Sequence, residues 1–520
     1  MFSTHHTRLL YFAGLAGIVA GLSLSKPAVS IGVMVCAGNW LLEKDLWQRI
    51  KSLKSNTFFW ISLALVILHV LGLLWSDNIP YGLKDIKTKL PIVLLPLFFL
   101  SSKEFNLKDE MRFVKIVFIG SLVICTLLSF GIYFHWIKPQ QFTPTDMRTM
   151  IFGVSGVRLA LFICLAIAFL AFDIFYQSSW KIKTGLLTLI VWFLFFLNFI
   201  ESGTAVIFLT ILMVYSILYI IMIRLNRLKR NMVMLVGLIV VLVIGMLFYN
   251  YISSMLVQKP NPVHSTITKY GEVYKNYSKV PYLENGYVVG HNIAINELTH
   301  AWNKRSAIKI GQKDKNGQAI LITLLRYLNS KSGIKDRDAV EHLTAKDISD
   351  IENGVANYTY QFMSGWQKRL YQIVYEFETY NTGLNPYGNS VTQRFEYWKI
   401  GYTIARANIL TGVGTGDVQD AYNAEYDKAF FKMAPEFRLR AHNQYLTMLL
   451  TFGIIGLLLF LIYAFSILWT GAYKEYTYFA LAFVLIMLFS FLSEDTLETQ
   501  SGVTFISFFL TLFIAKKTGK

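Results

Sequence analysis

The sequence predicts an all-α membrane protein that crosses the bilayer about twelve times. Of its 520 residues, 54% are hydrophobic and only 16% are charged, a balance that is typical of chains with many membrane spans and foreign to soluble enzymes. The apolar residues gather in runs close to the roughly 20 residues that a helix needs to cross a bilayer. Many basic residues lie in the short loops between those runs. These observations exclude a soluble globular fold.

Nine apolar runs precede a long polar segment, and three follow it. The predicted spans are 9–24, 28–43, 57–75, 88–101, 112–134, 157–176, 184–200, 202–223, 231–252, 446–470, 475–493 and 502–516. The second, fourth and last are short for a span. We expect the first to be retained, because no small-residue cleavage pattern follows it. The chain is therefore divided into an N-terminal bundle (1–252), a large loop or domain (253–445) and a C-terminal bundle (446–520).

Basic residues mark one side of the membrane. They follow alternate spans, at Lys44, Arg49, Lys51, Lys54, Lys181, Lys183, Arg224, Arg227, Lys229, Arg230, Lys516, Lys517 and Lys520. Cytoplasmic loops are enriched in Lys and Arg, so both termini are expected in the cytoplasm and the segment 253–445 outside it. This pattern explains the net charge of +17 without a nucleic-acid partner. Membrane lipid is the expected surrounding.

The polar segment between the ninth and tenth spans has its own helical signals. Apolar residues recur at helical spacing over 319–333 and over 345–380, and Thr344 is placed to cap the second stretch. We expect helices that lie over the outer membrane face. The three cysteines, Cys36, Cys125 and Cys164, all fall inside predicted spans, so we expect them to be buried and no disulfides to brace this segment.

Several ionisable residues are assigned to the outer boundary of the membrane by this topology. They are Arg158, Glu201, Arg394, Arg440, His442, Glu494, Asp495 and Glu498. Charges near lipid are costly and often functional. Each residue also has a plainer interpretation: Arg158 as a side chain that reaches the headgroups, His442 as a structural histidine, and Glu494 and Glu498 as a solvated rim. Their convergence on one face favours a site.

Two other patterns carry weaker signals. GVGTGD (412–417) resembles a phosphate loop, but it lacks the strand-to-helix setting and the glycine spacing of a nucleotide fingerprint. Its glycines are better explained by a tight turn or a close backbone approach. The nine histidines show no HExxH or Cys/His pattern, so we expect neither a zinc site nor another metal site.

Three motifs occur in a fixed order near the polar segment's end: RFEYW, then NILTGVGTGD, then RAHNQYLTMLLTFGIIGLLLF leading into a span. This order resembles the O-antigen ligase and polymerase superfamily of bacterial polysaccharide enzymes. Further stretches, at 71–99, 324–336, 388–398 and 493–509, are similar to the version found in Bacteroidota-type bacteria. The resemblance covers most of the chain and implies a GT-C-like fold.

The resemblance implies a glycosyltransferase of the bacterial inner membrane. Such an enzyme takes a glycan from an undecaprenyl-diphosphate carrier on the periplasmic side and passes it to an acceptor hydroxyl, on lipid A-core or another glycan. In the family, the arginine of R-x-x-x-W holds the diphosphate and the histidine of H-N accepts the proton. The matching residues are Arg394 and His442, with Asn443, Glu494 and Glu498 as possible support. Because arginines neutralise the diphosphate, neither metal nor cofactor is expected.

One position departs from the family. Many relatives carry a second arginine just before the span at 202–223, where this chain has Gly203 in ESGTA. Arg158 is our first hypothesis for the second positive charge and Arg440 the other.

The acceptor stays open at this point. We place an O-antigen ligase first and a polymerase close behind, with a protein O-oligosaccharyltransferase also sharing the motifs. A transporter would place charges in mid-span and show repeat symmetry, which the sequence lacks. A noncatalytic assembly protein is the remaining alternative.

Overall fold

The computed structural model describes residues 4–102, 107–134, 136–137, 152–255, 257–263, 265–277, 282–384, 386, 388–428, 434–470 and 476–514. Within these residues most of the secondary structure is helical, and the two short strands β1 (Leu283–Glu284) and β2 (Tyr287–Val288) form one antiparallel hairpin. The predicted all-α class is therefore confirmed. Lys516, Lys517 and Lys520 and the predicted span ends at 475, 515 and 516 lie outside the described residues.

In the described part of the chain, seven helical stretches are long and apolar enough to cross a membrane. They contain α1 (Thr4–Leu24), α4 (Thr57–Leu71), α7 (Leu107–Tyr133), α8 (Gly156–Tyr176), α9 (Trp180–Phe199), α10 (Gly203–Arg224) and α19 (Gln444–Thr470). The other predicted spans lie on α2 (Lys26–Leu42), α6 (Pro91–Ser101), α11 (Arg227–Met255), α20 (Thr477–Ser493) and α21 (Gln500–Ile514). The chain is thus a polytopic membrane protein, and each predicted span lies on a helix.

The last helix, α21, lies at the centre of the bundle. Every residue from Ser501 to Ile514 is buried, and α21 contacts α1, α2, α6, α19 and α20. Phe505 and Phe509 pack among the rings of Phe118 and Phe483. Cys36, Cys125 and Cys164 are buried free thiols, as expected. The C-terminal helices therefore complete the core of the N-terminal bundle.

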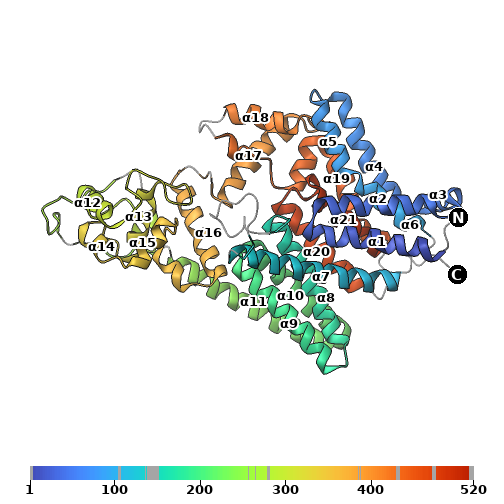
Figure 1. Cartoon of the computed structure of the whole chain (residues 1–520), viewed down its shortest axis with the longest axis horizontal. Coiled ribbons are helices and arrows are strands. Elements are labelled where there is room, and N and C mark those ends of the chain that lie inside the picture. The colour runs from blue at the N-terminus through green and yellow to red at the C-terminus, as the bar shows by residue number, and fades with distance from the viewer. Residues whose placement is uncertain are drawn as a thin grey trace.

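The polar segment forms a separate lobe and three helices that lead back to the bundle (Figure 1). The lobe contains α12 (Ile295–Arg305), α13 (Ile320–Lys331), α14 (Arg337–Glu341) and α15 (Ala345–Glu352), and the returning helices are α16 (Gly365–Asn381), α17 (Thr392–Ala407) and α18 (Val418–Lys428). Side chains such as Trp302, Tyr327 and Ile351 give the lobe its own hydrophobic core. α16 contacts both β1 and the bundle helices α9 and α10.

The predicted helical stretch 345–380 is three elements rather than one. α15 ends at Glu352, the 3₁₀ helix η4 spans Tyr358–Phe362, and α16 begins at Gly365. Gly354 has a φ of 82°, which a continuing α-helix does not allow. Ser364 then forms a capping box that starts a new helix. The predicted cap at Thr344 is confirmed, since its side chain accepts a hydrogen bond from the Asp347 amide.

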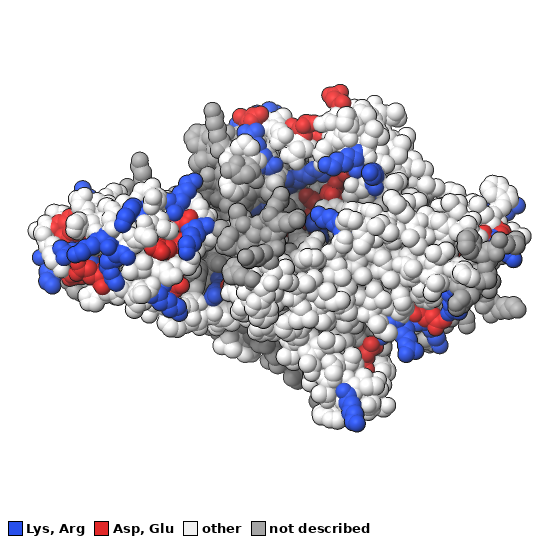
Figure 2. Space-filling view, in the orientation of Figure 1, with Lys and Arg blue, Asp and Glu red and all other residues white. Residues whose placement is uncertain are grey.

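Charged side chains are unevenly distributed over the molecule (Figure 2). In this view a broad surface without charged residues covers the middle of the bundle, whereas Lys, Arg, Asp and Glu gather over the lobe, over α5 (Ile79–Lys89) and along the lower and right-hand edges of the bundle. The uncharged surface is what lipid contact requires. Three short helical elements, α3 (Leu46–Ser52), η1 (Leu53–Ser55) and η2 (Gly72–Trp75), also occur in the N-terminal half.

The helix α19 is broken at Gly453, where the backbone has φ 64° and ψ −160°. The loop that follows α17 inserts here. The Ile454 amide donates to the Ile409 carbonyl, and the Val413 amide donates to the Leu450 carbonyl. Within a membrane protein, such a break needs partners for the freed backbone groups, and this loop supplies them.

We predict that Gly453→Ala destabilises the protein. A Cβ at this position would lie 2.2 Å from the Leu410 carbonyl oxygen, and the left-handed φ adds strain, so together we expect a loss of about 2–6 kcal/mol. The thermal midpoint of the purified protein, followed by fluorescence-detected gel filtration, measures it. Gly120→Ala on α7 is the control, because a Cβ there meets no atom within 4 Å; equal midpoints for the two variants would contradict the prediction.

Candidate active site

Arg394 and Trp398 lie one turn apart on α17 and therefore share a face of the helix. The Arg394 guanidinium donates to Oε1 of Glu494 at 2.9 Å and to the Ser390 carbonyl at 2.8 Å. The Trp398 indole donates to the Ala441 carbonyl at 2.9 Å. The R-x-x-x-W spacing thus places a guanidinium beside the acidic turn after α20 and fixes the segment that carries His442.

His442 is held in an uncommon backbone conformation, with a φ of 47°, which side chains other than glycine rarely adopt. Its amide donates to Asp495 at 3.0 Å, and the Asn443 amide donates to the other oxygen of the same carboxylate at 2.9 Å. The Thr447 hydroxyl is a third donor to Asp495, at 2.8 Å. Asn443 itself caps α19 by accepting from the Leu446 amide. The sequence placed Asp495 at this boundary but gave no indication of this structural role.

The imidazole of His442 faces a carboxylate. Its Nδ1 lies 3.6 Å from Oε2 of Glu494, and the ring is 30% exposed. Burial by itself would raise the pKa of Glu494, but the close contact with His442 and the charges of Arg394 and Arg158 outweigh it and lower that pKa. Burial raises the pKa of the neighbouring Asp495. Glu494 is thus an ionised group between a histidine and an arginine.

A second group of charges adjoins the first. Oε2 of Glu498 accepts from Arg440 at 3.1 Å and from Lys89 at 2.9 Å, and Lys89 also contacts Asp85 at 2.6 Å. Burial disfavours the charged form of Glu498, but Lys89 and Arg440 prevail and lower its pKa well below the usual range. The Arg440 guanidinium also donates to the Tyr81 hydroxyl.

The carboxylates at 494 and 498 are therefore not a solvated rim, since their side chains are only 16% and 11% exposed. Arg440 pairs with Glu498, and its position beside α5 separates it from the ion pair of Arg394. Sequence reasoning missed Lys89 and Asp85, although their four-residue spacing in LKDIK was a signal for a pair on one helix face.

Arg158, at the start of α8, reaches the same acidic turn. Both Glu494 and Asp495 act on it electrostatically. Among the described residues, its Nε is a buried donor with no hydrogen-bond partner, and so is the Nε of Arg394. Buried donors are normally satisfied, so two orphaned guanidinium donors at one place indicate a surface suited to an anion. The headgroup interpretation of Arg158 is thereby weakened.

The space in front of Gly203 is occupied by another arginine. A Cβ built at Gly203 would lie 3.2 Å from Cγ and 3.6 Å from Nε of Arg369, which comes from α16. This residue was not predicted from the sequence. Arg369 is 166 residues from Gly203 along the chain, so no local sequence pattern indicates that the two residues are in contact.

The loop GVGTGD (412–417) connects its segment to the end of α4 and to the turn before α5 through hydrogen bonds. The Thr415 hydroxyl donates to the His69 carbonyl, the Gly416 amide donates to Ser76, and Asp417 accepts from the first amides of the turn before α5. A Cβ at Gly412 would lie 2.2 Å from the Thr451 backbone. The interpretation as a close backbone approach is confirmed.

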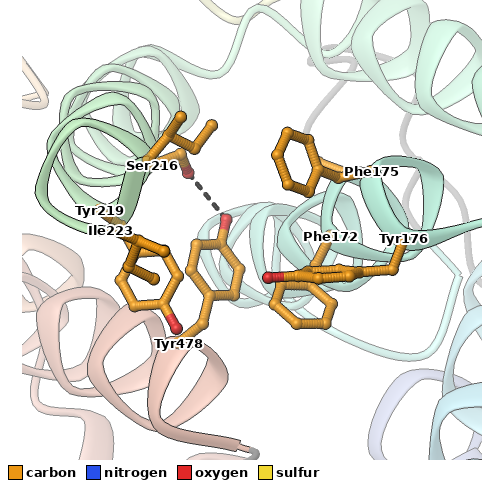
Figure 3. A pocket seen from close by; sticks show the side chains of 9 residues that line it. Phe172, Phe175, Tyr176, Ser216, Tyr219, Ile223 and Tyr478 are labelled. Atoms are coloured by element: carbon orange, nitrogen blue, oxygen red, sulfur yellow. Dashed lines mark hydrogen bonds between the residues drawn. The ribbon is translucent and has the colours of Figure 1, made fainter. Parts of the chain in front are cut away.

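A separate cavity lies at the other ends of α8 and α10 (Figure 3). Its volume is about 110 Å³, and aromatic and aliphatic side chains line it, apart from Ser216, whose hydroxyl lies 2.7 Å from that of Tyr478. Phe172 and Tyr176 on α8 are about 20–27 Å along the helix from Arg158, at 1.5 Å per residue. Without charged lining residues, this cavity offers no acid–base chemistry.

Comparison with known families matches residues 354–461 to the family described as O-antigen ligase. The match runs from the end of α15 through α16, α17 and α18 into α19, and it includes Arg394 and His442. No curated protein matches the chain.

We predict that Asp495→Ala lowers stability by about 3 kcal/mol or more. The substitution leaves three donors without their charged acceptor, and hydrogen bonds to charged groups are worth about 1.5–3 kcal/mol each. Asp495→Asn keeps one acceptor oxygen, so its stability should lie between those of the wild type and Asp495→Ala. Denaturation of the purified proteins measures the stability of each variant, and Asp77→Asn, at an exposed position, is the control. Wild-type stability of the alanine variant would show that Asp495 does not hold this segment.

Proposed function

We propose that this protein, whose residues 354–461 match the O-antigen ligase family, transfers a glycan from an undecaprenyl-diphosphate carrier to an acceptor hydroxyl. The site lies on the periplasmic side of the bacterial inner membrane. Lipid A-core is the first acceptor class, and another glycan is the second. The pair of orphaned arginine donors beside a histidine–carboxylate contact carries this proposal.

The arginines suit the leaving group of this reaction. A guanidinium stays charged and matches phosphate oxygens with a planar fork of donors. Arg394 is anchored by the Ser390 carbonyl and Glu494 before any donor binds, so little reorganisation is needed when negative charge develops on the diphosphate. Arg158 approaches from the opposite element, α8, and is the second candidate ligand. Arg440 is placed to act on the neighbouring cluster.

His442 suits the acceptor. A carboxylate beside Nδ1 favours the tautomer that carries its proton there, which leaves Nε2 to accept one. The acceptor oxygen attacks the anomeric carbon, its proton passes to Nε2, and the bond from the anomeric carbon to the phosphate oxygen breaks with its electron pair leaving on the diphosphate. Glu494 then stabilises the imidazolium. A single displacement of this kind inverts the anomeric carbon.

The orientation of the chain follows the loop charges. We place 253–445 in the periplasm, between membrane bundles 1–252 and 446–520, with both termini in the cytoplasm. This arrangement brings the site to the side on which exported, carrier-linked glycans are available. It is a proposal from the positive-inside pattern.

We predict that a cysteine at Lys313 reacts with an impermeant maleimide added to intact spheroplasts, and that one at Lys229 reacts only after lysis. Both positions are exposed, and the three native cysteines are buried, so the background should be low. Labelling of the Lys229 variant but not the Lys313 variant in intact spheroplasts would reverse the proposed orientation.

We predict that His442→Ala lowers transfer by about 10²–10⁴-fold, the usual contribution of a positioned acid–base group. The measurement uses purified full-length protein, a synthetic undecaprenyl-diphosphate glycan and lipid A-core, with product followed by mass spectrometry. Transfer should persist in EDTA, since arginines carry the charge of the diphosphate. His342→Ala is a matched control, because that exposed histidine lies on the lobe at the end of α14.

Near-full transfer by a folded His442→Ala variant would move the base role to Glu494. Extension of the donor glycan without use of lipid A-core would identify a polymerase instead. No transfer by the wild-type protein to either acceptor would leave a noncatalytic or transport role.

A further inference from the structure

We propose that Arg369 supplies a further guanidinium to the diphosphate subsite and binds the anion together with Arg394. This inference rests on the proposed function, because the diphosphate is that of the carrier. Arg369 lies on α16, outside both the R-x-x-x-W motif and the bundle helices. Its position beside Arg394, and not any feature of its local sequence, identifies it.

The two arginines meet at one residue. Arg394 donates to the Ser390 carbonyl at 2.8 Å, and Arg369 donates to the Ser390 hydroxyl. Because both acceptors belong to one serine, the two guanidiniums approach the same residue. From Arg394 the contacts continue to Glu494 and on to His442. Arg369 is therefore connected to the proposed proton acceptor through a short series of polar contacts.

The carboxylate that faces Arg369 has other partners. Oε2 of Glu376 accepts from the Val391 amide at 2.6 Å, and Oε1 accepts from the Ser390 hydroxyl at 3.3 Å. Its contact with Arg369 is 3.4 Å, against 2.9 Å for Arg394 and Glu494. Glu376 thus fixes the start of α17 and also pairs with Arg369, which donates to Gln372 at 3.0 Å as well.

Arg369 also lies against the positive end of a helix. The α10 helix begins at Gly203, and the Arg369 side chain packs over that glycine. A cation at a helix N-terminus is electrostatically unfavourable, whereas an anion there is favourable. An anion at this place would be favoured by both guanidiniums and by the helix end, in addition to the pairing of Arg369 with Glu376. A diphosphate is such an anion.

The Arg369 side chain is mostly buried but not completely enclosed. Its side chain is 11% exposed, close to the 13% of Arg440 and below the 24% of Arg394. A side chain that only braced α16 against α17 would have the same contacts with Ser390 and Glu376. The two roles differ in their effect on anion binding, which can be measured directly.

The test uses full-length protein and inorganic pyrophosphate as the probe, in buffer without divalent cations. We expect Arg369→Gln to raise the inhibition constant of pyrophosphate against the donor, and the donor KM, by about tenfold or more. Lys368→Gln is the matched control: it removes one positive charge from the adjacent position of the same helix, where Lys368 pairs with Glu201 at 3.3 Å. An unchanged inhibition constant in folded Arg369→Gln would overturn the proposal.

A second test moves the arginine from position 369 to position 203. The side chain at position 203 would extend into the space that Arg369 now fills, so Arg369→Ala with Gly203→Arg should recover pyrophosphate inhibition that Arg369→Ala alone loses. Where Arg369→Gln does not fold, Arg369→Lys replaces it: weaker inhibition supports the proposal, and unaltered inhibition refutes it.

The two proposals fail in distinguishable ways. If the wild-type protein transfers no glycan, the proposed function is wrong, and pyrophosphate binding by thermal shift still tests Arg369. If the wild type transfers glycan while neither inhibition nor donor KM responds to Arg369, only the present inference is wrong.

Discussion

The acidic turn between α20 and α21 is the constraint on which the site depends. Its three carboxylates, Glu494, Asp495 and Glu498, receive partners from α17, from the segment before α19 and from α5. Charges with so little exposure must be paired, because an isolated buried charge is very costly. Each carboxylate therefore holds a neighbouring element in position. The positions of Arg394, the His442 segment and Arg440 are consequences of that pairing.

The membrane architecture could be predicted because its signal is local. Apolar runs of suitable length fall on helices throughout, and the cap at Thr344 was predicted from the sequence and is present in the structure. The prediction went wrong where periodicity was extended through 345–380. Asn353 and Gly354 form a dipeptide that marks turns, and a periodic pattern continued on both sides of it. Apolar spacing alone does not reveal a break between two amphipathic helices.

The partners within the site could not be predicted, because they are distant along the chain. Lys89 and Glu498 are separated by 409 residues, and Arg394 and Glu494 by 100. Topology assigns such residues to one side of the membrane, but it does not say which of them touch. Topology assigned both Arg158, our first hypothesis for the second positive charge, and Arg440, the other, to the outer side without showing the contacts of either. In the structure Arg158 has an orphaned donor near Glu494, whereas Arg440 donates hydrogen bonds to Glu498 and Tyr81.

The same contacts explain why the arginine and the histidine can keep a fixed relation although they lie on different elements. Trp398 holds the Ala441 carbonyl one turn from Arg394, and the loop after α17 pairs with the broken part of α19 at Gly453. The site segment is thus attached to α17 at one end, and α17 is attached to α19 through the loop at the other. Catalytic groups are most effective when their positions are set before substrate binds. Here the positions of Arg394 and His442 are set by these two attachments and by the acidic turn. None of these contacts involves the lobe α12–α15.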